Sequence, residues 1–164
     1  MKDSNQMVHL LNLASRQISK LFNEHMAPSG LYAAQWTVIR YILKNGPSTQ
    51  IAMSSYLGVE APTMTRTINR LEKAGLIVRK EGKDRREKII NLTDLALSKI
   101  PYWEAEIDQF EVPLFESLTD SEICIANKVL EKIVLSIKQQ DKTGGNHIEE
   151  RDPLDQGFHI CITE

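Results

Sequence analysis

The chain has 164 residues, of which 41% are hydrophobic and 26% charged, with 20 basic side chains against 22 acidic ones. This length suits one domain with an appended tail, and the apolar fraction excludes disorder of the whole chain. No apolar run reaches the roughly 18–20 residues of a membrane helix, and the N-terminus does not resemble a signal peptide. Two cysteines are too few for a disulfide scaffold. We therefore expect a cytoplasmic protein without a membrane partner.

The charges are unevenly distributed along the chain. Residues 62–90 carry nine basic and four acidic side chains, a net charge of +5, whereas the other residues carry 11 basic and 18 acidic ones, a net charge of −7. A basic segment on an acidic chain indicates that an anionic partner binds at one place.

Apolar residues recur at helical spacing through the first half of the chain. The pattern predicts four helices, each ended by a Gly or Pro residue, over residues 5–26, 33–44, 49–57 and 62–74.

Two short β-branched runs follow these helices. Residues 76–80 and 88–92 flank a polar turn, which predicts a β-hairpin with a charged tip. Helical spacing then returns over residues 94–117, with a bend expected near the two prolines, and over residues 120–139 after a capping box.

Helix, short helix, helix and hairpin is the order of a winged helix-turn-helix. In the helix over 62–74, Met64, Ile68 and Leu71 share one face and are expected to pack inward. A second face carries side chains that can hydrogen-bond to base edges: Thr63, Arg66, Thr67 and Arg70. We therefore expect this helix to enter the major groove of DNA.

Arginines on one helix face, taken alone, indicate only a solvated surface. The hairpin adds Lys83, Arg85 and Arg86 at its turn, where a wing would reach the minor groove or the phosphates. Helix face and wing together favour binding of double-stranded DNA.

Residues 58–96, GVEAPTMTRTINRLEKAGLIVRKEGKDRREKIINLTDLA, resemble the core of MarR-type transcriptional regulators, with SlyA-like features. The shared landmarks are Pro62-Thr63, Arg66, Leu71-Glu72, Gly75-Leu76, Arg79, Asp84-Arg85-Arg86 and Leu92-Thr93. One departure is at the second helix, which keeps Gln35 but lacks the threonine with which the family often begins it.

The resemblance implies a mainly α fold with a small β-hairpin wing, a six-helix MarR-like homodimer built on the winged helix-turn-helix. The MarR-type domain would span residues 1–140, with a DNA-binding lobe at about 33–93 and a C-terminal tail of unknown role at 141–164. The dimerisation helices would be 5–26, 94–117 and 120–139, whose wide apolar stripes agree with this role.

The resemblance also implies roles for single residues. Thr63 and Arg66 would contact bases, and Arg85, with Arg86 beside it, would enter the minor groove, while Asp84 would stiffen the wing. Charge and position alone assign phosphate contacts to three further residues: Arg70, Lys73 and Lys83.

Many members of this family bind a small aromatic or phenolic acid between the dimer helices and the winged lobe. Candidate pocket residues here are Met7, Tyr32, Trp36 and Arg40. For Met7 and Trp36, a place in the core is the simpler interpretation. No other cofactor and no metal site are expected, because the histidines, acidic residues and cysteine of the tail lack a ligand spacing.

The sequence carries none of the common catalytic motifs, so we expect no enzyme. It predicts a transcriptional regulator that binds double-stranded DNA in a sequence-specific way. This regulator would be a homodimeric repressor that binds a pseudo-palindromic operator and responds to a ligand. The alternative is a winged-helix module for protein–protein interaction that does not bind DNA.

Overall fold

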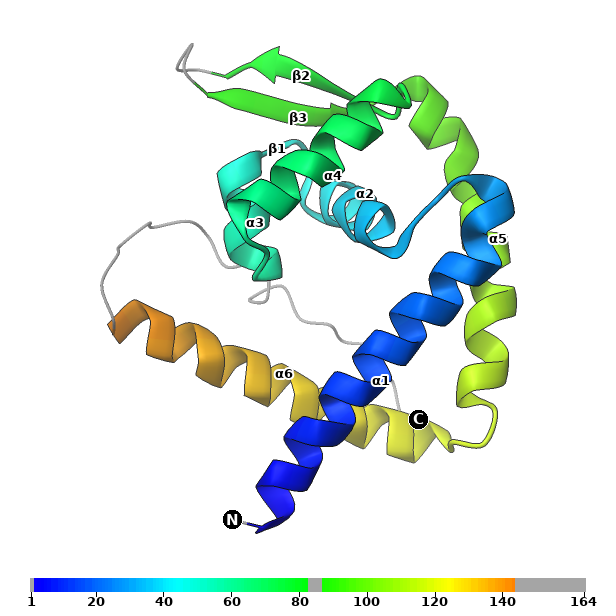
Figure 1. Cartoon of the computed structure of the whole chain (residues 1–164), viewed down its shortest axis with the longest axis vertical. Helices are drawn as coiled ribbons and strands as arrows, with labels where there is room; N and C mark the ends of the chain where they lie inside the picture. Colours follow the sequence, from blue (N-terminus) through cyan, green and yellow to red (C-terminus); the bar gives the residue numbers. More distant parts are fainter. Residues whose placement is uncertain (1, 83–86, 144–164) are drawn as a thin grey trace. The chain divides into compact units, whose positions relative to one another are not determined.

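The computed structural model describes residues 2–82 and 87–143. Contacts divide the chain into two compact units, Met1–Glu111 and Val112–Glu164. The elements follow in the order α1 (Lys2–Met26), η1 (Ala27–Ser29), α2 (Ala33–Asn45), β1 (Ser48–Thr49), α3 (Gln50–Leu57), α4 (Ala61–Lys73), β2 (Ile77–Glu81), β3 (Lys88–Leu92), α5 (Asp94–Phe115) and α6 (Asp120–Thr143) (Figure 1). The predicted helices and hairpin are confirmed, and α5 runs past both of its prolines as one helix.

The small sheet is antiparallel and has the strand order β1-β3-β2. Strands β2 and β3 pair from Ile77 opposite Leu92 to Glu81 opposite Lys88, and the Gly82 amide donates to the Glu87 carbonyl at 2.9 Å beyond the last pair. This hairpin projects from the helices as a wing (Figure 1). Strand β1 was not predicted, because two residues are too few to show a period.

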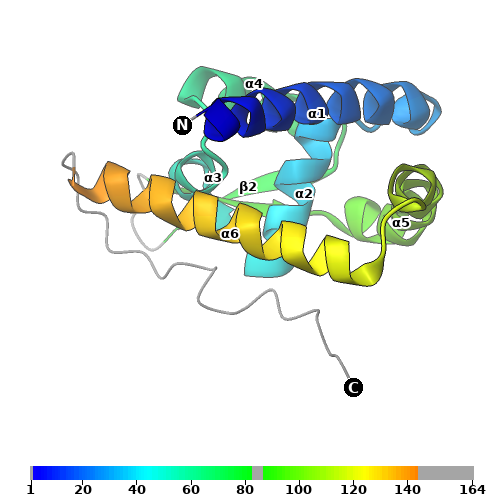
Figure 2. The same cartoon turned by 90° about the horizontal axis from the view of Figure 1, so that it is seen from below.

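The core of the first unit forms around α2, which packs against both α4 and α5 (Figure 2). Trp36 of α2 is buried and meets Trp103 of α5 edge to face, with 6.5 Å between ring centroids. Ile39 is fully buried on the same helix. Such aromatic pairs add to the stabilisation from apolar burial alone. For Trp36, the structure therefore supports the interpretation as a core residue.

Helix α2 begins without the expected threonine, and another helix supplies the missing acceptor. The Ala33 amide donates to Oδ1 of Asn23 on α1 at 2.8 Å, and the Tyr32 amide donates to Oε1 of Gln35 at 3.0 Å. Both amides belong to the first turn, where the helix itself offers no acceptor. The departure from the family pattern is thus compensated by a tertiary contact.

Thr93 joins three parts of the first unit. Its hydroxyl donates to the Gly75 carbonyl at 2.7 Å and accepts from the Ala96 amide at 3.2 Å, while its own amide donates to the Leu76 carbonyl at 3.1 Å. Gly75 has φ of 72°, the left-handed conformation that ends many helices. The end of α4, the end of β3 and the start of α5 are therefore held together by one side chain.

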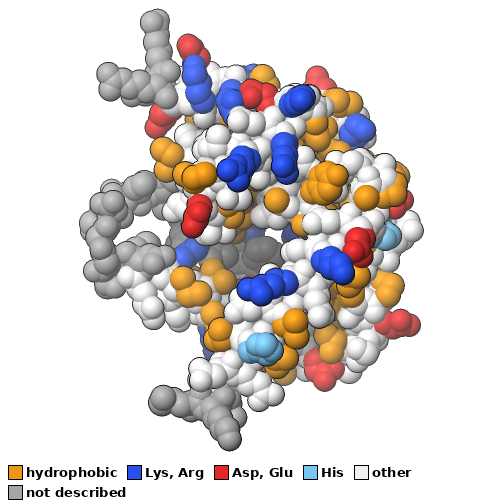
Figure 3. All heavy atoms as spheres, viewed as in Figure 1, with side chains coloured by type: hydrophobic (Ala, Val, Ile, Leu, Met, Phe, Trp, Pro, Cys, Tyr) orange, Lys and Arg blue, Asp and Glu red, His pale blue; other side chains and the backbone are white. Residues whose placement is uncertain are grey.

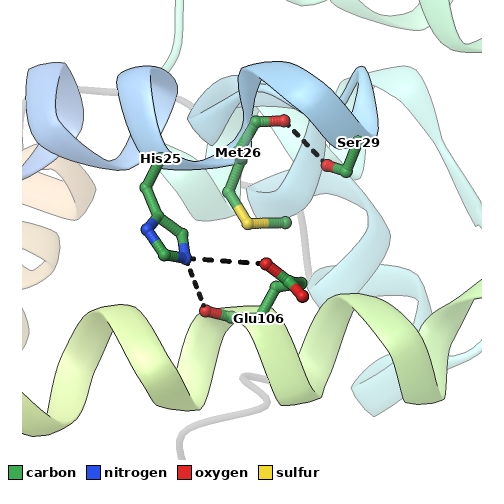
Figure 4. A network of polar contacts seen from close by, with 4 residues as sticks. All are labelled: His25, Met26, Ser29 and Glu106. Atoms are coloured by element: carbon green, nitrogen blue, oxygen red, sulfur yellow. Dashed lines mark hydrogen bonds and ion pairs between the residues drawn. The ribbon is translucent and has the colours of Figure 1, made fainter.

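Helices α1 and α5 are joined by aromatic and polar contacts. Phe22 meets Phe110 edge to face at 5.6 Å between ring centroids. Next to them, Nε2 of His25 lies 3.0 Å from the carbonyl oxygen of Glu106 and 3.8 Å from its carboxylate (Figure 4). Met26 is 1% exposed beside this contact. The end of α1 is thus anchored on α5, whereas most of its length is exposed.

The predicted capping box begins α6 in the second unit. The Thr119 amide and hydroxyl donate to the Glu122 carboxylate at 2.9 and 2.8 Å, and the Glu122 amide donates to the Thr119 hydroxyl at 3.3 Å. The hydrogen bonds from Thr119 lower the pKa of Glu122, because they stabilise its charged form. The bond from the backbone amide has the larger effect, and the bond from the hydroxyl follows.

We expect Asn23→Ala to lower the free energy of unfolding by about 1 kcal/mol, because the Ala33 amide loses its acceptor. Urea denaturation at fixed protein concentration measures the change. The control is Asn12→Ala on the exposed part of the same helix, where Nδ2 donates to the Val8 carbonyl. That variant should change the free energy by less than about 0.5 kcal/mol. Equal effects would contradict the capping role.

Candidate nucleic-acid interface

Helix α4 divides lengthwise into a buried side and an exposed side. Met64, Ile68 and Leu71 are at most 1% exposed and belong to the core. After Ala61, the exposed first residue, the exposed side chains of α4 cover an arc of about 120° at 100° per residue, with Arg66 at its centre. These side chains are Pro62, Thr63, Arg66, Asn69, Arg70 and Lys73.

Thr67 does not belong to the exposed side, contrary to our prediction. Its side chain is buried at 9% exposure, and its hydroxyl donates to the Thr63 carbonyl one turn back at 3.1 Å. Its place in the helix sets it next to Met64 and Leu71 rather than next to Arg66. The Thr67 hydroxyl is thus used within the helix, so the prediction that Thr67 is exposed beside Arg66 is wrong, while its contact with DNA stays a prediction.

The exposed side of α4 is basic. The side chains of Arg66, Arg70 and Lys73 form no ion pair or hydrogen bond with another residue of the described segments. Figure 3 shows basic side chains gathered over α4 and the hairpin on the face turned to the viewer. Cations without a local partner keep their full attraction for an external anion.

Helix α4 is fixed against α3, as a helix-turn-helix requires. Nε2 of Gln50, the first residue of α3, donates to the Thr65 hydroxyl at 2.6 Å, and that hydroxyl donates to the Ala61 carbonyl. Thr49 caps α3 by accepting from the Ala52 amide at 3.1 Å, and Gly58 ends it with φ of 61°. The two helices are therefore joined at the end of α4 that would enter the groove first.

The wing is fixed to α4 by Arg79 of β2. Its Nη1 lies 2.8 Å from Oε2 of Glu72, and its Nη2 donates to Oδ1 of Asn69 at 2.6 Å. Glu72 and Asn69 are neighbours on one edge of α4. One guanidinium thus contacts two side chains of α4 at once. The planar group of arginine allows this double contact, whereas the single ammonium group of lysine does not.

Part of the predicted site lies outside the described residues. The wing-tip residues Lys83, Asp84, Arg85 and Arg86 belong to this part, as does the tail at 144–164. Of the predicted DNA-binding residues within the described segments, Thr63, Arg66, Arg70 and Lys73 are brought together on one side of α4.

The four candidate effector residues have different surroundings in the structure. Met7 lines a shallow apolar hollow made by α1 alone, together with Gln6, Leu10, Leu11 and Ala14. Trp36 is buried in the core, whereas Tyr32 and Arg40 are exposed. The predicted pocket stays a prediction.

Within residues 2–82 and 87–143, no three His, Cys, Asp or Glu side chains are placed to hold a metal ion. None of the helices in those segments has the length and the apolar character that a membrane span needs.

Comparison with known proteins identifies the family. The model of the MarR family matches residues 29–87. The uncharacterized HTH-type transcriptional regulator YwoH of Bacillus subtilis is 41% identical over 116 residues, which cover 71% of this chain and 85% of that protein. The chain belongs to the MarR family. It is therefore a transcriptional regulator and not an enzyme, while the SlyA-like subgroup stays a prediction.

Solved MarR structures share its fold. A MarR protein from Peptoclostridium difficile superposes with a TM-score of 0.75 at 24% identity, covering 85% of this chain and 92% of that one. A MarR variant from Escherichia coli, solved with operator DNA, gives a TM-score of 0.71 at 22% identity, covering 78% and 93%. The predicted mainly α, winged helix-turn-helix fold is thus confirmed, while the homodimer is left to a test in solution.

Sequence reasoning recognised Arg79 as a family landmark but missed what it holds. Asn69 lies three residues after Arg66, at a helical spacing that puts both on the exposed side of α4. That spacing was the available signal for Asn69. The contact with Arg79 has no such signal, because it joins a helix to a strand.

We expect the Arg79–Glu72 pair to show a coupling free energy of about 0.5–1 kcal/mol in a double-mutant cycle with alanine, falling with added salt. The two side chains are 31% and 39% exposed, so solvent screens much of the attraction. The cross-strand pair of Lys88 with Glu81, at 3.3 Å and more exposed, is the comparison and should couple less. A Glu72–Arg79 coupling no larger than that of Lys88–Glu81 would contradict the clamp.

Proposed function

We propose that this MarR-family chain is a sequence-specific regulator that binds double-stranded operator DNA through the exposed side of α4. The observation that carries the proposal is the division of α4, with Met64, Ile68 and Leu71 fully in the core and unpaired basic side chains opposite them. An α-helix of this kind fits the major groove of B-DNA. The structural likeness to a MarR variant solved with operator DNA supports the same use of the fold.

Single residues can be given roles on this basis. Arg66, at the centre of the exposed arc, would make a bidentate contact to guanine O6 and N7, and Thr63 would offer a hydroxyl and a methyl group near the start of the helix. Arg70 and Lys73 lie toward the end of α4, where phosphate contacts fix the register of the helix in the groove.

The roles proposed for the wing tip, residues 83–86, rest on the sequence alone. Arg85 and Arg86 would enter the flanking minor groove, Lys83 would contact phosphates and Asp84 would stiffen the loop. The Arg79 clamp supports this arrangement, because it ties β2 to the helix that would read the major groove.

We further propose that the protein acts as a homodimer. Large apolar side chains, 39–59% exposed in the single chain, follow both end helices: Met7, Val8, Leu10, Leu13, Ile18 and Leu21 on α1, and Ile125, Leu130, Val134, Leu135 and Ile137 on α6. Apolar stripes of this length favour burial against another chain. A two-fold dimer would read a pseudo-palindromic operator with its two α4 helices.

In this proposal, residues 1–140 form the MarR-type domain, with the winged lobe at about 33–93 and the dimerisation helices around it. Repression in the cytoplasm would follow from occlusion of a promoter. A small aromatic or phenolic acid would release the DNA, with Met7, Tyr32 and Arg40 as the accessible candidates for its contacts.

We expect Arg66→Ala and Arg85→Ala each to weaken operator binding by about 1–3 kcal/mol, and Arg66→Ala also to relax sequence preference. Fluorescence anisotropy on DNA selected from genomic fragments measures both effects, and affinity should fall with rising salt. Lys99→Ala, which removes a charge from the exposed surface of α5, is the control and should bind like wild type. Unchanged affinity of both arginine variants would contradict the proposal.

We expect light scattering to give twice the 18.7 kDa of one chain at micromolar concentration. Leu10→Asp should lower this mass, because a charge would be buried in the apolar stripe of α1. Ser19→Asp, on a polar and exposed position of the same helix, should leave the dimer intact. A wild-type protein with the mass of one chain would refute the homodimer.

A further inference from the structure

Asn69 is held by Arg79 in a way that determines what its side chain can do. Arginine has only hydrogen-bond donors, so the amide group of Asn69 must turn its carbonyl oxygen toward Nη2 of Arg79, at 2.6 Å. The other end of the guanidinium is engaged by Glu72 at 2.8 Å, which prevents Arg79 from turning away. The side-chain amide is therefore fixed at its oxygen.

The nitrogen of the same amide is left with its donors unused. Nδ2 of Asn69 makes no hydrogen bond within residues 2–82 and 87–143, and the side chain is exposed. An amide has two N–H donors, which water satisfies in the free protein. A ligand on this surface would therefore meet a pre-oriented donor.

The position of Asn69 places this donor on the surface proposed for DNA. It lies one helical turn after Arg66 and one turn before Lys73 on the exposed side of α4. It borders the edge of α4 that faces the wing, because Arg79 of β2 is its partner.

We propose that Asn69 donates a hydrogen bond from Nδ2 to an acceptor of the operator, and that Arg79 is the residue that positions it. This inference rests on the proposed DNA binding by α4. The acceptor is a base edge, such as guanine O6 or N7 or thymine O4, or a phosphate oxygen.

The contact with Arg79 also constrains a readout that asparagine commonly provides. The bidentate contact with adenine needs Oδ1 to accept from N6 while Nδ2 donates to N7. Here Oδ1 already accepts from Arg79, so one of its two lone pairs is in use and the orientation of the amide is set by Arg79 and not by a base. Nδ2 is the end of the amide with unused donors, and Arg79 orients it without touching DNA.

The decisive variant is Asn69→Asp, compared with Asn69→Ala. Aspartate keeps the acceptor for Arg79, so the melting temperature should not fall, but it has no donor and repels phosphates. We expect operator affinity to fall about five- to tenfold in Asn69→Ala, the usual effect of one lost hydrogen bond, and further in Asn69→Asp. Wild-type affinity of Asn69→Asp would show that the side chain only supports Arg79 and would overturn the proposal.

Three further results separate the outcomes. If Arg66→Ala loses affinity and Asn69→Asp does not, the proposed DNA binding stands and only the role of Asn69 falls. If wild-type protein binds no selected DNA, the proposed function itself fails. Selection of sites with Asn69→Ala distinguishes the acceptors, since loss of preference at one base pair indicates a base and a uniform loss indicates a phosphate.

The positioning role of Arg79 has its own test. Arg79→Lys keeps a positive charge beside Glu72 but cannot hold both partners with a planar fork. It should lower operator affinity in the wild-type background and have no further effect in Asn69→Ala. Additive losses would show that Arg79 acts independently of Asn69 and would overturn this part of the proposal.

Discussion

The burial of one side of α4 is the constraint on which the rest of the site depends. Met64, Ile68 and Leu71 are excluded from water, and this fixes the rotation of the helix about its axis. Once the rotation is fixed, Arg66 must point away from the core. Hydrophobic packing thus decides which polar side chains of α4 face the solvent, and a substitution in the core would change that surface by turning or loosening the helix.

A second set of contacts fixes the neighbouring elements to α4. Thr93 holds the end of α4 to the start of α5, and Arg79 holds β2 to the edge of α4. Each contact joins elements that are distant in the chain through one side chain with two partners. The α4 helix and the strands of the wing are therefore connected through side-chain contacts, and a change in one of them can affect the other.

The exposed side of α4 could be predicted in large part because it follows from helical period alone. Arg66, Arg70 and Thr63 are where the spacing put them. The predicted exposure of Thr67 is wrong for a physical reason: threonine is amphipathic, and its hydroxyl can donate to the carbonyl one turn back. Capacity for hydrogen bonding therefore did not reveal exposure. The hydrogen bond from the Ala33 amide to Asn23 could not be predicted either, because ten residues and a turn separate the two.

The sequence by itself determined the order of the main helices and the hairpin, the family and the basic character of residues 62–90, since these depend on local period and composition. Only the tertiary structure decided which end of the Asn69 amide is free, which hydroxyl of α4 is used internally and which basic side chains lack a partner. The reason is that hydrogen bonds between elements depend on distances that no sequence spacing encodes. A net charge of −2 for the chain conceals a basic surface that the fold gathers on one side of one helix.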